Sequence, residues 1–362
     1  MRDPRVTGQA RLLVRYCLRA RSRQTIGVAG ASAAEPLIAA VYEELLRAGA
    51  FPVVTMLPTG AEEAFFRCAR PHHFDALTPY QQAHARTVDA MIHIQAAANT
   101  RALSGVRPDK QARLARATAP LRNVLGAKPY VITIFPTAAF AQDAEMSLGE
   151  FEDMVFAAMF ADQPDPAAAW RALRARQQRL IARLAGAKDV RIVGAGTDLT
   201  FSLRGRRFIN SDGRRNMPSG EVFSAPVEDS AEGAIEFDFP ACHAGRAIES
   251  VRLVFRRGVV VEAGAARNEP FLRAMLKTDA GASRLGEFGI GTNPRLRRFT
   301  RNILLDEKIG GTIHLALGRA YPEAGGLNRS AIHWDLIKDL RRGGAVYVDG
   351  RPFQRDGRLV CG

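Results

Sequence analysis

The spacing of apolar and polar residues changes along the chain near residue 186. Before this point, short apolar runs are separated by segments with the three-to-four-residue spacing of amphipathic helices. These apolar runs are residues 24–29, 51–57, 91–96 and 130–135. After this point, apolar residues alternate at Val190 and Ile192 and again at Leu199, Phe201 and Leu203, which is typical of strands with one buried face, and strands are predicted to dominate as far as Val261. The pattern therefore predicts two domains of different fold class.

The first domain is predicted to be an α/β fold with an open parallel sheet. Residues 35–48 have apolar side chains at helical spacing and lie between the first two apolar runs. Strands that are joined through a helix are parallel, because antiparallel neighbours need only a short turn. A long helix is expected to begin at Pro166, since proline is tolerated in a first turn, and to end at Leu184. We assign residues 1–185 to this domain.

The second domain, residues 186–362, is predicted to be a β-rich α+β fold. Glycine-containing turns separate the expected strands, and one helix is expected at Pro270–Lys277. This half of the chain also contains the residues that we interpret as a metal site, so we describe it as the metal-binding catalytic domain.

The chain has a formal net charge of +14, which raises the question of a nucleic-acid partner. Most of the positively charged residues are arginines, and several of them lie within the predicted helix that begins at Pro166. They are not interleaved with aromatic residues. We interpret them as a solvated helix surface and expect no nucleic-acid partner.

Hydropathy argues against a membrane protein. No apolar run approaches the ~18–20 residues that a membrane-spanning helix needs. Residues 1–10 are polar and lack the pattern of a secretory signal. We therefore expect a cytoplasmic protein without a membrane partner.

Candidate chemistry concentrates in residues 216–339. Glu221 follows a Pro-Ser-Gly turn and begins a short apolar segment, so the backbone would hold it in place. Glu287 lies among small and apolar residues, and a buried carboxylate must be paired, protonated or bound to a metal. Taken alone, Glu221 also fits an ordinary solvated turn, and Glu287 is as easily structural as functional.

Histidines in the same region provide imidazole ligands. His314 has apolar neighbours on both sides, which also fits a core histidine that is hydrogen-bonded to backbone. His333 and Asp335 are separated by one residue, and on an extended segment such positions point to the same face. The two side chains can meet one ion or two adjacent ions, although an incidental surface pair fits as well.

The combination is more informative than its parts. Carboxylate and imidazole ligands together suit zinc, cobalt or manganese. There are enough candidates for two ions, which are typically about 3.5–4 Å apart and share a water and a carboxylate. We assign the bridging position to Glu287, because its surroundings predict burial.

The motifs of this region resemble those of the aminopeptidase T/aminopeptidase S family of dinuclear metallopeptidases. The matching segments are N-M-P-S-G-E-V-F-S-A-P (216–226), L-G-E-F-G-I-G-T-N-P (285–294), D-E-K-I-G-G-T-I-H-L-A-L-G-R-A-Y-P (306–322) and G-L-N-R-S-A-I-H-W-D (326–335). They occur in the family's order and nearly at its spacing. Weaker similarity upstream, at 35–50 and 193–203, extends the resemblance over most of the chain.

The resemblance implies six metal ligands, a two-domain fold, a homodimer and removal of N-terminal residues from peptides with broad side-chain tolerance. The implied ligands are Glu221, Glu287, His314, Tyr321, His333 and Asp335. The implied cofactor is a pair of divalent ions, zinc or cobalt, with manganese and magnesium as alternatives. The loops from Glu287 to His314 and from Tyr321 to His333 are shorter than in well-known members, which leaves the substrate's size and identity open.

The sequence thus predicts a metal-dependent aminopeptidase. In this hypothesis a metal-bound hydroxide attacks the scissile carbonyl at a two-metal site, and Glu287 is the catalytic residue that relays protons. The alternative is a single-iron, ring-cleaving dioxygenase of the dihydroxypyridine type on the same scaffold, with His314, His333 and Asp335 as iron ligands. A non-catalytic nucleic-acid-binding protein is a third hypothesis, and the net charge is its only support.

Overall fold

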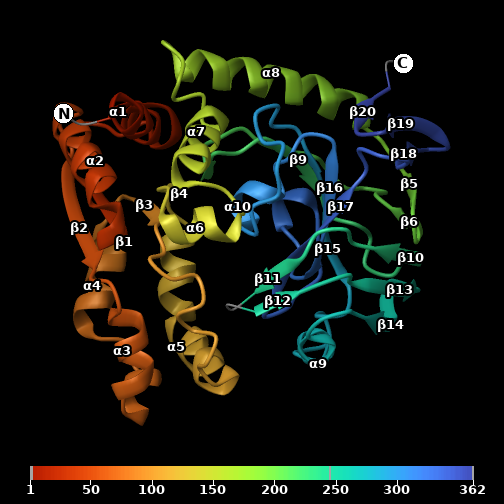
Figure 1. Cartoon of the computed structure of the whole chain (residues 1–362), viewed down its shortest axis with the longest axis horizontal. Helices are drawn as coiled ribbons and strands as arrows, with labels where there is room; N and C mark the ends of the chain where they lie inside the picture. The colour runs from red at the N-terminus through yellow and green to blue at the C-terminus, as the bar shows by residue number, and fades with distance from the viewer. Residues whose placement is uncertain (1–2, 244–245, 361–362) are drawn as a thin grey trace. The chain divides into compact units, whose positions relative to one another are not determined.

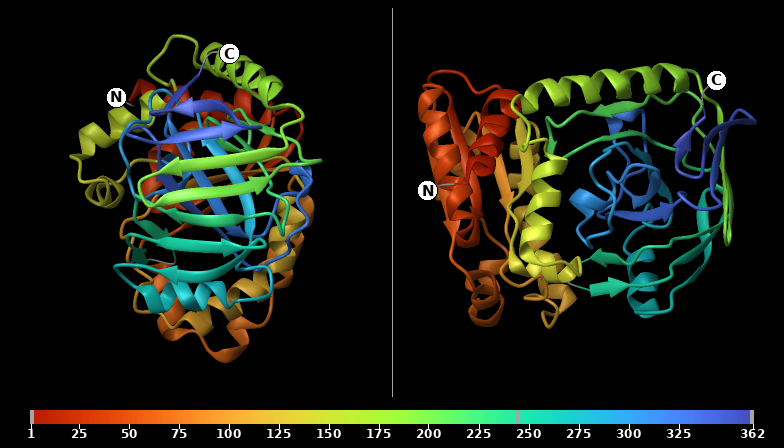
Figure 2. Two further views of the ribbon diagram at one scale, coloured as in Figure 1. Left: turned by 90° about the vertical axis from the view of Figure 1, so that its right-hand side faces the viewer. Right: turned by 45° about the horizontal axis from the view of Figure 1, so that its top comes forward.

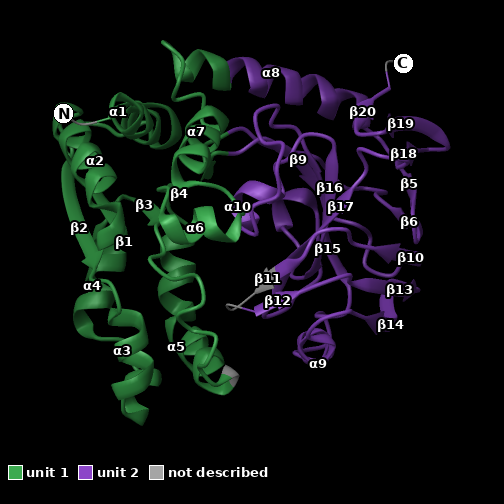
Figure 3. Ribbon diagram, viewed as in Figure 1, with its two compact units in different colours: residues 1–170, 213–218 green, residues 171–212, 219–362 purple. Residues whose placement is uncertain are grey.

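The structure, a computed structural model, describes residues 3–243 and 246–360, which fold as two compact units (Figures 1 and 3). The first unit comprises Met1–Trp170 and Gly213–Pro218, and the second comprises Arg171–Asp212 and Ser219–Gly362. The division of the chain falls inside a long helix. The boundary that we placed between residues 185 and 186 stays a prediction.

The first unit is built on a parallel sheet with strand order β2-β1-β3-β4-β8. Its strands are β1 (Thr25–Ala31), β2 (Phe51–Leu57), β3 (Ala90–Gln95), β4 (Tyr130–Ile134) and β8 (Asn216–Met217). The first four correspond to the apolar runs, so the predicted α/β class is confirmed. Strand β8 comes from a distant segment, and its pairing with Ile132 and Thr133 was not anticipated.

Helices connect these strands. The α-helices are α1 (Pro4–Arg11), α2 (Glu35–Arg47), α3 (Ala61–Cys68), α4 (Pro79–Thr87), α5 (Pro108–Gly126), α6 (Ala138–Asp143), α7 (Leu148–Ala158) and α8 (Pro166–Leu184), and shorter helical turns are at Leu12–Leu18, Ser32–Ala34 and Pro71–Phe74. Helix α2 buries Leu37, Val41 and Leu45 completely, at the four-residue spacing that places them on one face. Helix α8 begins and ends at the predicted residues.

The second unit contains mainly antiparallel strands. They are β5 (Asp189–Gly194), β6 (Thr197–Ser202), β7 (Ile209–Ser211), β9 (Glu221–Ser224), β10 (Glu232–Glu236), β11 (Ala241–His243), β12 (Arg246–Ile248), β13 (Arg252–Arg256), β14 (Val259–Gly264), β15 (Leu285–Gly291), β16 (Thr312–Gly318), β17 (His333–Asp339), β18 (Ala345–Val348), β19 (Arg351–Arg355) and β20 (Arg358–Leu359). Besides the part of α8 from Arg171 onward, its helices are α9 (Glu269–Leu276), α10 (Ile303–Asp306) and the short turn η4 (Pro322–Ala324). Across the residues that the structure describes, no helix is both long and apolar enough to cross a bilayer.

These strands form two main sheets. The larger has the order β14-β13-β10-β6-β5-β18-β19-β20 and is seen face on in the left panel of Figure 2. The smaller has the order β17-β16-β15-β9-β7. The two share one apolar core, in which the ring of Phe201 on β6 lies 5.2 Å from that of Phe288 on β15. Each strand of the smaller sheet therefore has one face toward this core and one face away from it.

Candidate metal centre

The smaller sheet brings predicted ligands from four strands, β9, β15, β16 and β17, to the face opposite the core. Leu315 and Leu336 are buried in the core, so their neighbours in sequence point the other way. In the strand register, Ala316 of β16 pairs with Glu287 on one side and with Asp335 on the other. Side chains that are distant in sequence thus become cross-strand neighbours.

Small residues make room for the imidazole of His314. Gly289 pairs with His314 across β15 and β16, and a Cβ atom at Gly289 would overlap the imidazole ring. Gly291 pairs in the same way with Glu221, the first residue of β9. Glycine is therefore needed at positions 289 and 291, because a larger side chain at either position would collide with its neighbours.

Glu287 lies between the two histidines, with one carboxylate oxygen toward each. Oε1 of Glu287 is 3.2 Å from Nε2 of His314, and Oε2 is 3.3 Å from Nε2 of His333. His314 Nε2 is also 3.3 Å from Oε2 of Glu221, and His333 Nε2 is 3.6 Å from Oδ2 of Asp335. The structure therefore brings five of the six predicted ligands into one continuous cluster.

The backbone orients His333. Its Nδ1 lies 2.7 Å from the carbonyl oxygen of Arg319. A carbonyl only accepts hydrogen bonds, so Nδ1 carries the proton and donates it there. In the neutral ring, Nε2 then presents its lone pair to Glu287 and Asp335. A ring nitrogen that donates to a backbone carbonyl fixes the tautomer and the orientation of the ring, as is common for metal-ligating histidines.

The pKa values reflect the same contacts. Burial by itself would raise the pKa of Glu287, but hydrogen bonds from His314 and His333 and their charges hold it well below its usual range. Burial would lower the pKa of His333, yet the charge of Asp335 and the hydrogen bond to Glu287 raise it to about 9. The carboxylates thus favour a positive charge at this position, supplied either by protons or by a bound cation.

Two further charged residues, Glu307 and Lys308, belong to the cluster and were missed in the sequence analysis. Lys308 is fully buried, and its Nζ lies 3.1 Å from Oε1 of Glu221 and contacts Glu307 as well. The sequence does contain an indication of their burial, because these charged residues lie between the apolar residues Leu305 and Ile309. A buried ion pair of this kind has to be satisfied by partners, which here are the site's own carboxylates.

Tyr321 lies at the edge of the cluster, immediately before η4. Its ring is 5.0 Å from the ring of His333 and 5.2 Å from that of Phe223. The aromatic contact places Tyr321 beside a predicted ligand. Its own role as a ligand stays a prediction.

The donor set fits divalent ions. Glu221, Glu287, Glu307 and Asp335 contribute four carboxylates; Lys308 pairs with Glu221 and Glu307, and the histidines contact Glu221, Glu287 and Asp335. Within the described residues, Oδ1 of Asp335 is buried without a hydrogen-bond partner, and Oε2 of Glu221 makes no hydrogen bond besides its ion-pair contact with His314. Buried carboxylate oxygens need a partner, and a cation is the natural one.

Potential ligand atoms also form two compact groups. Those of Glu287, His314 and Asp335 lie within 4.8 Å of one another, and so do those of Glu221, Glu307 and His314. Both groups share His314. The chemistry is that of oxygen and imidazole ligands, which suits zinc, cobalt or manganese and not a thiolate-bound metal.

A buried cluster of carboxylate and imidazole groups can hold the divalent ions of a metal-dependent hydrolase. The chain belongs to the peptidase M29 family: the family profile, described as thermophilic metalloprotease (M29), matches residues 2–357. The family resemblance found in the motifs is thereby confirmed, and the chain is a metallopeptidase.

Curated relatives carry aminopeptidase names. The chain is 31% identical over 305 residues to aminopeptidase T of Thermus thermophilus, which covers 72% of this chain and 74% of the relative. It is 26% identical to aminopeptidase 2 of Geobacillus stearothermophilus over an alignment of 409 residues, which covers 96% of each protein.

Solved structures show the same fold. Wild-type AmpT from Thermus thermophilus matches with a TM-score of 0.86 and 24% identity, over 99% of each chain. A 2,5-dihydroxypyridine dioxygenase from Pseudomonas putida KT2440 matches with a TM-score of 0.59 and 16% identity, over 99% of this chain and 97% of the other. At these identities the likeness concerns the fold alone. The predicted two-domain architecture is confirmed.

Proposed function

We propose that this chain removes N-terminal residues from peptides at a centre of two divalent ions. The predicted enzyme class, a metal-dependent aminopeptidase, is confirmed by the family and by the aminopeptidase relatives. The proposal adds the number of ions and the residues that hold them. The observation that carries it is the pair of carboxylate–imidazole groups that meet at His314.

The proposed ligands are those named from the sequence. They are Glu221, Glu287, His314, Tyr321, His333 and Asp335, with zinc or cobalt as the proposed metal and manganese or magnesium as alternatives. Bound divalent ions supply two things: they lower the pKa of a water molecule, and they polarise the scissile carbonyl.

Glu287 is the proposed catalytic residue. Its carboxylate is nearly inaccessible to solvent and is held between His314 and His333. Its carboxylate is ionised at neutral pH, which is the form whose oxygen can accept a proton from the attacking water. The same oxygen can then deliver that proton to the departing amine.

In this proposal, the ligands Glu221 and His333 are held in position by hydrogen bonds that involve the backbone. The buried side chain of Gln177, on α8, donates a hydrogen bond of 2.7 Å to the carbonyl oxygen of Glu221 and so fixes the start of β9. His333 is fixed by the carbonyl of Arg319. Side chains held by backbone contacts keep a geometry that metal binding demands.

Metal analysis combined with a panel of aminoacyl chromogenic substrates tests this function. We expect two divalent ions per purified chain and release of free N-terminal residues. Removing the ions with a chelator should abolish hydrolysis, and adding back zinc or cobalt should restore it. A single iron per chain, together with oxygen uptake on a dihydroxylated aromatic, would instead establish the dioxygenase alternative.

We also propose a homodimer that forms along β2, the edge strand of the parallel sheet. Phe51, Met56 and Leu57 on this strand are 60%, 47% and 49% exposed. An edge strand with exposed apolar side chains is a template for pairing with a second chain. A second copy is the simplest partner, because two β2 strands can pair about a twofold axis.

Met56→Lys is therefore expected to convert the dimer into a monomer at micromolar concentration, as measured by sedimentation equilibrium. Val261→Lys is the matched control, because Val261 is 50% exposed on β14, the edge of the other large sheet. A monomeric wild-type protein, or an equal effect of both variants, would refute this interface.

The cytoplasmic location and the expected lack of nucleic-acid and membrane partners stay predictions.

A further inference from the structure

Two compact groups of potential ligand atoms meet at the candidate metal centre, and the structure places a lysine in one of them. The Asp335 group consists of Glu287, His314 and Asp335, and the Glu221 group consists of Glu221, Glu307 and His314. Lys308 contacts both carboxylates of the Glu221 group. We propose that Lys308 makes the two ion positions unequal, so that the Asp335 group binds a divalent ion tightly and the Glu221 group binds the second ion more weakly. The inference rests on the two-ion centre of the proposed function.

The contacts of Lys308 fix the position of its charge. Its Nζ atom lies 3.1 Å from Oε1 of Glu221 and also contacts Glu307, and the whole side chain is buried. The backbone is held on both sides: the nitrogen of Lys308 donates to the carbonyl of Leu305 at 3.1 Å, and its carbonyl accepts from the nitrogen of Asn293 at 3.0 Å. We therefore expect the ammonium group to stay beside these carboxylates when an ion binds.

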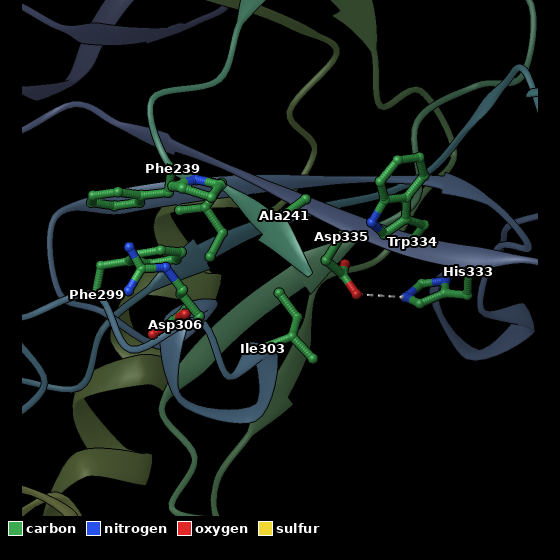
Figure 4. A pocket seen from close by; sticks show the side chains of 11 residues that line it. Phe239, Ala241, Phe299, Ile303, Asp306, His333, Trp334 and Asp335 are labelled. Atoms are coloured by element: carbon green, nitrogen blue, oxygen red, sulfur yellow. Dashed lines mark ion pairs between the residues drawn. The ribbon is translucent and has the colours of Figure 1, made fainter. Parts of the chain in front are cut away.

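The carboxylates of the Asp335 group have a different kind of partner. Within the described chain, Glu287 and Asp335 make their ion pairs with His314 and His333. Figure 4 shows the side chains of His333 and Asp335 directed toward one another, beside a pocket that both residues line. A neutral imidazole offers a lone pair to an ion, whereas an ammonium group offers hydrogens only. An ion in this group therefore meets carboxylates that are not already paired with a lysine.

Glu221 has to serve Lys308 and an ion at the same time. Its Oε1 faces Lys308, and its Oε2 lies 3.3 Å from Nε2 of His314. One carboxylate oxygen is thus already engaged before an ion arrives. Two positive charges that share a buried carboxylate repel each other strongly, because the surroundings screen them poorly. Lys308 therefore holds Glu221 in place in the metal-free protein and weakens the binding of an ion to the Glu221 group.

Zinc titration of the metal-free, full-length protein in competition with a chelating dye tests the inference. We expect two ions per wild-type chain, with Kd values that differ at least about tenfold. Lys308→Met removes the charge and keeps a side chain of similar length. It should lower the weaker Kd at least about tenfold more than the stronger one. Equal Kd values in the wild type, or a weaker Kd that does not respond to Lys308→Met, would overturn the inference.

Lys338→Met is the matched control. Lys338 is also buried in the second unit, and its Nζ lies 3.1 Å from Oδ1 of Asp238, a carboxylate outside both ligand groups. Either variant removes a buried lysine from its carboxylate partner, so both should lower the urea midpoint of the metal-free protein.

Saturating zinc distinguishes the two lysines. It should reduce the difference in urea midpoint between Lys308→Met and the wild type, because an ion that binds more tightly to the folded variant stabilises it more. The difference for Lys338→Met should not change, and its two Kd values should equal those of the wild type. A zinc-independent difference for Lys308→Met would show that the lysine has a structural role only.

Glu307→Gln provides a second test that does not require the protein to fold without its buried lysine. Glutamine removes one carboxylate of the Glu221 group and retains Lys308. The weaker Kd should then rise at least about tenfold, and the stronger Kd should rise less, because the lysine charge is opposed by one carboxylate fewer. An unchanged weaker Kd would exclude the Glu221 group as the position of the second ion.

The outcomes separate this inference from the proposed function. Two unequal Kd values that respond to Lys308→Met, in a protein that releases no N-terminal residues, would refute the proposed function and support this inference. Saturation at one ion per chain in both the wild type and Lys308→Met would refute the two-ion centre and this inference together. Peptide hydrolysis with two ions whose affinities do not respond to Lys308→Met would refute this inference alone.

Discussion

Replacing Glu287 by glutamine is expected to reduce kcat/KM for aminoacyl substrates by about 10²–10⁴-fold while the protein remains folded. Glutamine preserves the shape of the side chain but replaces one carboxylate oxygen with an NH₂ group. That group can neither accept the proton nor bridge two cations. Since the two oxygens of Glu287 face His314 and His333 separately, either orientation of the amide disrupts one side of the cluster.

Steady-state kinetics should be combined with thermal unfolding and metal analysis of the same samples. Glu262→Gln, an exposed glutamate on β14, is the matched control and should retain wild-type activity. A Glu287→Gln protein that binds two ions but is inactive would assign the proton-transfer role, and one that binds a single ion would assign the bridging role. Wild-type activity in that variant would exclude Glu287 from the mechanism.

Lys308→Met is expected to lower the free energy of unfolding of the metal-free protein by about 3–5 kcal/mol. Lys308 is fully buried against Glu221 and Glu307. Methionine fills a similar volume but leaves the buried carboxylate of Glu221 and the half-buried carboxylate of Glu307 without the lysine cation. Breaking such a group on one side is costly because the remaining charges are poorly hydrated and have lost their principal partner.

Urea denaturation monitored by circular dichroism measures this change. Lys277→Met, at an exposed lysine after α9, is expected to stay within about 0.5 kcal/mol of the wild type. The double variant Lys308→Met/Glu307→Gln should recover part of the loss, because it removes one of the unpaired charges. A loss below about 1 kcal/mol for Lys308→Met would contradict the proposed role of this ion pair.

Local patterns predicted much of the fold. The four-residue spacing of Leu37, Val41 and Leu45 predicted α2, and Pro166 marked the start of α8. Such features depend on neighbouring residues only. Strand β8 could not be found in this way, because Asn216 and Met217 become a strand only through their pairing with β4, more than eighty residues earlier.

The candidate site was partly predictable for the same reason. The alternation of His333 and Asp335 and the apolar setting of Glu287 are local signals. The contact of Lys308 with Glu221 depends on where β9 lies beside the loop after α10, which no local pattern encodes. The stacking of the Phe239 and Phe299 rings, which are sixty positions apart in the sequence, likewise depends on the tertiary fold.

The hydrogen bond between His333 and the carbonyl of Arg319 has a consequence for how this site tolerates genetic change. The acceptor belongs to the main chain, and the Arg319 side chain is exposed. Substitutions at Arg319 can therefore alter the surface without disturbing the His333 imidazole. Proline is the exception, because the Arg319 nitrogen donates to the carbonyl of Ile332 and a proline has no hydrogen to give. The orientation of the His333 ring thus depends on the course of the backbone at residue 319, which most single substitutions at that position leave unchanged.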